Sequence, residues 1–242
     1  TGSGKTTSLY SFLKSLNKED VNITTIEDPI ENNISGVNQI QVNSKVNMTF
    51  AAALRAILRQ DPNIIMIGEI RDEETAEIAV KAAITGHLVL STLHTNSAHG
   101  TISRLVDMGI PKYLVADALI GAISQRLVRK LCPNCKKPHM TTPEEMKELG
   151  LTEPVQIYEP GSCGNCNNTG YHGRTGVFEI LNMNPTIKKA IEMSEFSMET
   201  IYDACVSSGM IPLKEAAKKL VLEGVTSYSE YIALLDNDTE IK

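Results

Sequence analysis

Hydrophobic and polar positions change their period repeatedly along the first 95 residues, which predicts alternating helices and strands. Helical spacing indicates helices at 6–16, 49–59 and 73–84, the second capped by Thr49. Short apolar or β-branched runs indicate strands at 21–26, 37–42, 63–67 and 87–93. Short connections between such elements are typical of a mostly parallel sheet with helices on both faces. We therefore expect an α/β fold that binds its ligand at the carboxyl ends of the strands.

The second half of the chain is organised differently. We predict helices at 95–108 and 111–125, a strand at 175–181, and mostly helices from Pro185 onward. Thr142 and Glu145 form a capping box at the start of a short helix that has Pro143 in its first turn and Gly150 just past its end. A second box, from Ser227 to Glu230, opens the last helix.

Composition and charge narrow the class of protein. The chain has 242 residues, 42% of them hydrophobic, which is ordinary for a globular protein. Its 23 basic and 29 acidic side chains sum to −6, which disfavours general binding to nucleic acid. The apolar runs are too short for a transmembrane helix, and no signal-peptide pattern opens the chain. Nothing in these patterns directs the chain to secretion.

One local stretch, 125–139, is basic and holds no acid; its cations are Arg126, Arg129, Lys130, Lys136 and Lys137. It is either a solvated face, the commoner case, or a surface that meets an acidic partner or an anionic membrane.

The chain opens with a phosphate-binding motif. Its first seven residues read TGSGKTT and match the end of the pattern G-x-x-x-x-G-K-[ST] (Thr1, Gly2, Ser3, Gly4, Lys5, Thr6 and Thr7). In this pattern, backbone N–H groups at a helix N-terminus surround phosphate oxygens. Lys5 would reach the β- and γ-phosphates of a nucleotide, and the Thr6 hydroxyl would bind Mg²⁺. A turn that merely caps a helix is the less favoured alternative.

Acidic residues follow two of the predicted strands. The run IIMI ends at Gly68 and Glu69, which makes Glu69 the candidate to orient Mg²⁺ and activate water. Glu27 and Asp28 end another strand and could hold the water shell of the metal, although Asp28 before a proline is also a common turn.

Other polar residues near these strand ends are weaker candidates. His94 could sense the γ-phosphate, or it could be an ordinary hydrogen-bonding residue; His87, at the start of the same strand, carries less weight. Arg71 could serve as an arginine finger because it stands two residues from Glu69. Arg55 is better explained by surface pairing.

Four cysteines form two C-x-x-C pairs, at Cys132 and Cys135 and at Cys163 and Cys166. Two such pairs can offer four thiolates to one tetrahedral ion, and Zn²⁺ prefers this set in structural sites. An iron–sulfur cluster or idle thiols are the alternatives. The fifth cysteine, Cys205, fits a helical core position.

Further strings make the sequence resemble the ATPases that power type IV pilus assembly and type II secretion. They are TIEDPIE at 25–31, similar to the family's Asp box; LRQDP at 58–62 leading to GEIRD at 68–72, similar to its Walker B motif; and TGH to HTN at 85–96, similar to its His box. The resemblance runs from Thr1 to about Tyr231.

This resemblance implies a RecA-like core, a homo-hexamer at the cytoplasmic face of the inner membrane, and ATP hydrolysis coupled to pilin or pseudopilin assembly through a membrane platform protein. Glu69 would be the catalytic glutamate, and His87 and His94 the His-box positions. The cysteines match the zinc motif of the assembly branch, which favours extension over retraction. We expect a core at 1–131, a zinc module at 132–173 and a helical region at 174–242.

Two other functions remain open at this point. One is a nucleic-acid motor on the same RecA-like core, which the negative charge and the 5% aromatic content argue against. The other is a scaffold that binds nucleotide and zinc without catalysis, with Glu69 in a structural role.

Overall fold

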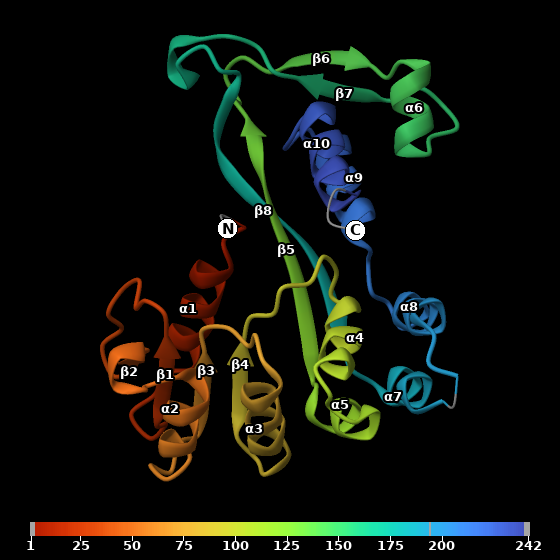
Figure 1. Cartoon of the computed structure of the whole chain (residues 1–242). Coiled ribbons are helices and arrows are strands. Elements are labelled where there is room, and N and C mark those ends of the chain that lie inside the picture. Colours follow the sequence, from red (N-terminus) through yellow and green to blue (C-terminus); the bar gives the residue numbers. More distant parts are fainter. Residues whose placement is uncertain (1–2, 194, 240–242) are drawn as a thin grey trace. The chain divides into compact units, whose positions relative to one another are not determined.

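The structure, a computed structural model, describes residues 3–193 and 195–239 (Figure 1). The chain forms two compact units, each built from separate segments. The first, which we call the sheet unit, consists of 4–122 and 181–209. The second, the cysteine unit, consists of Ser3, 123–180 and the residues from 210 onward. The helices after Pro185 are thus shared between the two units, and the limits 1–131, 132–173 and 174–242 stay predictions.

The sheet unit is built on a parallel sheet. Four strands, β1 (Ile23–Glu27), β2 (Asn38–Gln41), β3 (Ile64–Ile67) and β4 (Leu88–Ser91), are arranged in the order β2-β1-β3-β4. Each neighbouring pair is parallel, with Ile26 opposite Ile67 and Ile67 opposite Ser91. The carboxyl ends of the four strands therefore lie at the same end of the sheet, which we call the carboxyl edge. The predicted parallel sheet is confirmed.

Helices cover both faces of this sheet because the strand side chains alternate between them. Helix α1 (Lys5–Leu16) packs Tyr10 and Leu13 on Ile23, Ile64 and Met66. The opposite face carries fully buried isoleucines, and α2 (Phe50–Ile57) and α3 (Glu73–Ile84) contact β1 and β4. Figure 1 shows that α1 begins at the edge where the strands end.

Four further helices complete the sheet unit: α4 (Gly100–Asp107), α5 (Lys112–Ala118), α7 (Pro185–Glu192) and α8 (Met198–Ser207). The helix predicted at 95–108 starts later, because Ser97 Oγ accepts the N–H of Gly100 and holds a turn there. Cys205 is fully buried in α8, as expected for a core residue.

The prediction of one helix at 111–125 was wrong in its second half. The chain leaves α5 at Leu119, which is extended, and forms strand β5 (Gly121–Leu131). Strand β5 pairs with β8 (Tyr171–Asn182), which contains the predicted strand at 175–181. Pairing with a segment about fifty residues away overrides the local helical period of such a short stretch.

The cysteine unit has its own core. Strands β6 (Lys137–Met140) and β7 (Gln156–Glu159) are antiparallel and flank α6 (Pro143–Leu149), whose Thr142–Glu145 capping box forms as predicted. Two further helices of this unit are α9 (Leu213–Leu222) and α10 (Tyr228–Thr239). The buried cluster that joins these elements to β5 and β8 consists of Val128, Leu149, Ile157, Val177, Leu213, Ala217, Val221, Tyr231 and Leu234.

The box predicted from Ser227 to Glu230 forms only in part. Ser227 Oγ accepts the N–H of Glu230, but the Glu230 carboxylate binds Arg129 at 2.7 Å. The Arg129 side chain also stacks on the ring of Tyr171, and Lys136 donates to the carbonyl of Gly224. Two cations of the basic stretch therefore serve contacts inside the cysteine unit.

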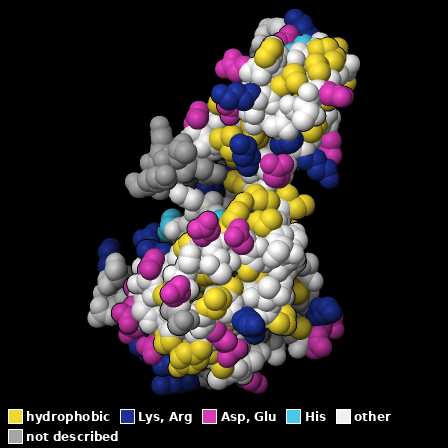
Figure 2. Space-filling view, turned by 90° about the vertical axis from the view of Figure 1, so that its right-hand side faces the viewer, with side chains coloured by type: hydrophobic (Ala, Val, Ile, Leu, Met, Phe, Trp, Pro, Cys, Tyr) yellow, Lys and Arg dark blue, Asp and Glu magenta, His cyan; other side chains and the backbone are white. Residues whose placement is uncertain are grey.

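None of the helices among the described residues has the length and apolarity needed to cross a membrane. On the face shown in Figure 2, acidic and basic side chains are interspersed.

Candidate functional site

Helix α1 begins directly after a left-handed glycine. Gly4 has φ 83°, and Lys5 is the first helical residue. The first turn carries no acidic residue and no side-chain cap, so its N–H groups and Lys5 form a positive helix end. Thr6 and Thr7 are exposed there.

Ser3 precedes this turn, and its carbonyl accepts a hydrogen bond from Gln125. Thr1 and Gly2, also predicted to bind phosphate, lie outside the described residues.

Glu69 lies just beyond the end of β3 with both carboxylate oxygens engaged. Oε1 accepts a 2.5 Å ion-paired hydrogen bond from Arg71, and Oε2 lies 3.1 Å from His94 Nε2. The Glu69 side chain is only 13% exposed, whereas that of Arg71 is 66% exposed. Three predicted site residues from two strand ends thus meet at one edge of the sheet.

The turn that carries Glu69 is tied to both neighbouring strands. The N–H of Gly68 donates to the carbonyl of Ile26 in β1, and Thr92 Oγ1 donates to the carbonyl of Gly68. A Cβ on Gly68 would lie 3.3 Å from the Ile26 oxygen and 3.4 Å from Glu27 Cα. Glycine therefore fits where the backbone passes close to β1, and Thr92, which sequence reasoning missed, helps to orient Glu69.

The charges around Glu69 keep it ionised. Burial raises the pKa of Glu69, but hydrogen bonds from Arg71 and His94 outweigh it and lower that pKa below its ordinary value. The pKa of Arg71 is raised by Glu69 and, less strongly, by Asp28. Asp28 is exposed at the end of β1, so it belongs to the same charged group.

We expect Arg71→Met to raise the pKa of Glu69 toward its ordinary value, because the variant removes the strongest opposing interaction. A lowered carboxyl pKa stabilises the native state above the unfolded-state pKa, and this contribution disappears as the pH falls through the native pKa. The variant should therefore lose stability near neutral pH and show less loss on acidification. Carboxyl ¹³C NMR titration of Glu69 measures the shift directly. Arg55→Met is the matched control, since Arg55 pairs with Glu74 instead; an unchanged Glu69 titration in Arg71→Met would contradict the expectation.

Glu27, the other predicted catalytic carboxylate, is buried at the end of β1. It is only 3% exposed and accepts hydrogen bonds from Tyr10, Thr25 and Gln39. Burial, then the hydrogen bond to Glu27, raise the pKa of Tyr10, which keeps its hydroxyl a donor. Tyr10 was not singled out from the sequence because it occupies an ordinary apolar position of α1.

The structure does not bring His87 to these residues. His87 precedes β4, and the next residue, Leu88, pairs with Ile64 at the start of β3. His87 therefore lies at the opposite edge of the sheet from Glu69, with Nδ1 2.9 Å from the carbonyl oxygen of Ala82. Arg55 forms the surface pair that the sequence suggested.

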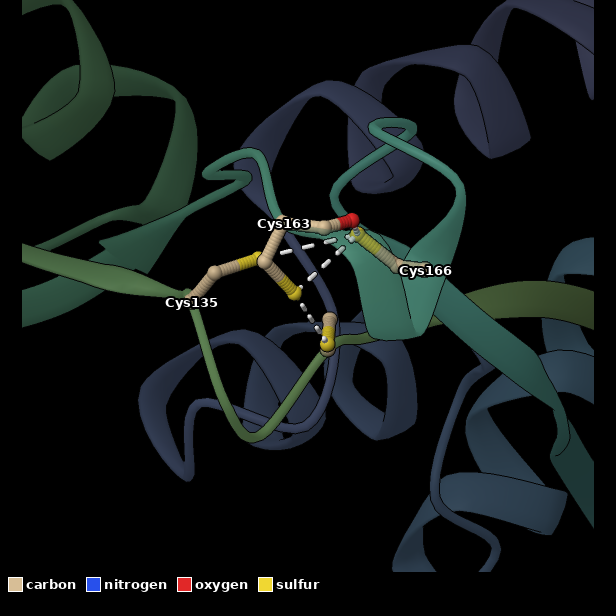
Figure 3. A group of neighbouring side chains, drawn as sticks. Cys135, Cys163 and Cys166 are labelled. Carbon is tan, nitrogen blue, oxygen red and sulfur yellow. Dashed lines mark hydrogen bonds between the residues drawn. The ribbon is translucent and has the colours of Figure 1, made fainter.

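The four paired cysteines converge in the cysteine unit (Figure 3). Their sulfur atoms all lie within 4.8 Å of one another, and three of the separations are 3.7 to 3.8 Å. Four sulfurs bound tetrahedrally to Zn²⁺ at about 2.3 Å lie about 3.8 Å apart. The cluster therefore fits a four-coordinate zinc ion, and none of the four cysteines is in a disulfide.

Close backbone packing holds the two cysteine knuckles together. A Cβ on Gly161 would lie 1.8 Å from the carbonyl oxygen of Cys135, so only glycine fits there. The N–H of Gly170 donates to Cys166 Sγ at 3.2 Å. Burial raises the pKa of the Cys166 thiol, but hydrogen bonds, first from Gly170, outweigh it and lower the pKa to about 6. A thiolate at Cys166 is therefore favoured near neutral pH.

Known proteins are similar to this chain over most of its length. A family model described as type II/IV secretion system protein matches residues 1–233. Type II secretion system protein E of Dickeya dadantii is 49% identical over 232 residues, which cover 96% of this chain and 46% of the relative. Type IV pilus assembly ATPase PilB of Acinetobacter baylyi is 50% identical over 236 residues, covering 95% of this chain and 40% of the relative.

The fold matches solved structures as well. The crystal structure of the pilus retraction motor PilT with bound ADP has a TM-score of 0.71 and 31% sequence identity, and the match covers 96% of this chain and 58% of that chain. The sheet unit is thus a RecA-like α/β core. The chain spans about half the length of the curated relatives that it matches. It belongs to the family of type II/IV secretion system proteins.

Proposed function

We propose that this chain is the motor part of an ATPase that powers assembly of a type IV pilus or of a type II secretion pseudopilus. The observation that carries the proposal is Glu69, an ionised carboxylate held by Arg71 and His94 at the sheet edge where α1 begins. The relatives named above supply the setting, since one is a pilus assembly ATPase and another a type II secretion protein.

In this proposal the start of α1 binds the phosphates of ATP. Backbone N–H groups after Gly4 and the Lys5 ammonium face the phosphate oxygens, together with Ser3 and Thr7 and with Thr1 and Gly2 outside the described residues. The exposed Thr6 hydroxyl would hold Mg²⁺, with exposed Asp28 near its water shell. The bound metal supplies positive charge that offsets the charge developing on the phosphates.

Glu69 is the proposed general base. Its lowered pKa means that the carboxylate is ionised, which a general base must be before it accepts a proton from the attacking water. To do so it must share or give up its contacts with Arg71 and His94, and the guanidinium of Arg71 and a ring N–H of His94 can then donate to phosphate oxygens. Arg71, largely exposed, is free to make this change.

The cysteine unit would bind one structural Zn²⁺ through Cys132, Cys135, Cys163 and Cys166. The sulfur separations support this proposal, and four thiolates leave no open position for catalysis.

The proposed assembly is a homo-hexamer on the cytoplasmic face of the inner membrane, attached through a platform protein, with no nucleic acid bound. Arg129 is a poor candidate for docking because Glu230 neutralises it, whereas Lys130 and Lys137 remain exposed. A docking surface built on the basic stretch would therefore depend on these two lysines.

The test is Mg²⁺-dependent phosphate release from ATP by the full-length protein, beside Lys5→Ala. Because Lys5 carries the charge at the phosphate-binding turn, we expect its loss to weaken ATP binding and to lower turnover by at least about a hundredfold. Lys14→Ala, in the last turn of the same helix, is the control and should behave like the parent. Absence of ATP turnover in the assembled parent protein, or full turnover in Lys5→Ala, would refute the proposal.

A further inference from the structure

Among the described residues, three neutral side chains donate hydrogen bonds to the carboxylate of Glu27. Oε1 accepts from Thr25 Oγ1 at 2.6 Å and from Gln39 Nε2 at 3.0 Å. Oε2 accepts from Tyr10 Oη at 2.5 Å. With both oxygens engaged and 3% of the residue exposed, Glu27 is not placed to bind a metal ion or a water molecule at the sheet edge.

Of the three donors to Glu27, Tyr10 alone belongs to a helix; the other two belong to the sheet. Thr25 belongs to β1 and Gln39 to β2, but Tyr10 lies in α1, five residues after Lys5. Its hydroxyl oxygen also accepts from the N–H of Glu31 at 3.2 Å and of Asn32 at 3.4 Å. One phenol thus connects the phosphate-binding helix to the end of β1 and to the loop that follows it.

The end of β1 is in turn connected to the turn that carries Glu69. The carbonyl of Ile26 accepts the N–H of Gly68 at 2.8 Å, and there is little space between Gly68 and Glu27. A continuous path of hydrogen bonds and close backbone contact therefore runs from α1 through Tyr10 and β1 to Glu69.

We propose that Tyr10 and Glu27 are positioning residues: their buried hydrogen bond fixes the phosphate-binding end of α1 relative to the turn that carries Glu69. This inference rests on the proposed ATPase function, and it gives Glu27 a role different from the metal-shell role expected from the sequence. Catalysis by positioning is sensitive to small displacements, because a shift of about 1 Å can cost a hundredfold in rate.

Two substitutions that remove a single hydroxyl test the inference. Tyr10→Phe and Thr25→Val each delete one donor to Glu27 with little change of shape, but only Tyr10 belongs to α1. In the full-length protein we expect both variants to lower the melting temperature. Only Tyr10→Phe should weaken Mg²⁺–ATP binding and lower kcat, each by about tenfold. A melting curve alone reports a structural role, whereas the difference in ATP affinity and kcat reports positioning.

Glu27→Gln separates positioning from metal binding. If Glu27 acts through Tyr10, the Mg²⁺ concentration for half-maximal turnover stays within about twofold of the parent, because the amide loses the negative charge but keeps an oxygen that can accept from Tyr10. A raised Mg²⁺ requirement in Glu27→Gln alone would restore the metal-shell role and overturn the inference.

The remaining outcomes are equally decisive. Tyr10→Phe with parental ATP affinity and kcat, or Thr25→Val with losses as large as those of Tyr10→Phe, would overturn the positioning role while leaving the ATPase function in place. A parent protein that neither binds nor hydrolyses ATP would instead refute the proposed function and, with it, this inference.

Discussion

Glu69→Gln is expected to lower Mg²⁺-dependent ATP hydrolysis by about 10²- to 10⁴-fold while leaving ATP bound. The amide cannot accept the proton of the attacking water, but it keeps the shape of the side chain and its place beyond β3. Arg71 would lose its anionic partner and become free to pair with phosphate. We therefore expect ATP affinity to be equal to or higher than that of the parent. Phosphate release and binding of a fluorescent ATP analogue, in the full-length protein, measure the two effects separately.

A matched control comes from the next helix. Glu77→Gln makes the same chemical change in α3, where Glu77 pairs with Lys81 on the surface. It should keep parental turnover, because an exposed pair of this kind contributes little. If Glu69→Gln hydrolysed ATP at the parental rate, Glu69 would be structural and the scaffold function would become the better explanation.

Cys163→Ser with Cys166→Ser is expected to abolish zinc binding and to unfold the region around the two knuckles. Both side chains belong to the four-sulfur cluster, so two of its four ligands are lost. Structural Zn²⁺ contributes about 10–16 kcal/mol in small zinc domains at neutral pH, which exceeds the stability of a typical domain. Zinc content after gel filtration and the thermal unfolding of the full-length protein are the measurements.

The fifth cysteine provides the control for this experiment. Cys205→Ser changes a buried cysteine of the sheet unit and should cost some stability without any loss of zinc. One zinc per chain retained in the double variant would rule out the four-cysteine site. Iron in place of zinc in the purified parent protein would show that the four cysteines hold an iron–sulfur cluster, the alternative that the sequence left open.

Local patterns were sufficient for most of the sheet unit. Helix α3 was predicted with its observed limits, and the strands were predicted within a few residues, because short apolar runs between capped helices leave few other arrangements. The prediction failed at 119–125. The helical spacing of apolar residues extends into this segment, but the segment leads into β5, which pairs with β8. Whether a segment forms a strand depends on the neighbouring strand with which it pairs, and the local spacing of apolar residues carries no information about a distant partner.

Residue types and spacing also predicted the candidate site groups. The glycine–lysine turn, the acid after an apolar strand and the two cysteine pairs were found because each has a fixed local geometry. The structure adds which of these groups meet: Arg71 and His94 hold Glu69, and the sulfur atoms of the cysteine pairs converge. The family resemblance was confirmed by the comparisons.

The sequence alone did not show which candidate side chains are buried, nor at which end of the sheet each of them lies. Glu27 ends β1 and Glu69 closely follows β3, so the two carboxylates look alike in the sequence. Glu27, however, is buried under hydrogen bonds from Tyr10, Thr25 and Gln39, whereas Glu69 pairs with the largely exposed Arg71. His87 and His94 flank the same strand but lie at opposite edges. A sequence motif shows which chemical groups the chain contains. Whether a carboxylate such as Glu27 can react depends also on the hydrogen-bond donors that folding brings to it from other elements, here from α1 and β2.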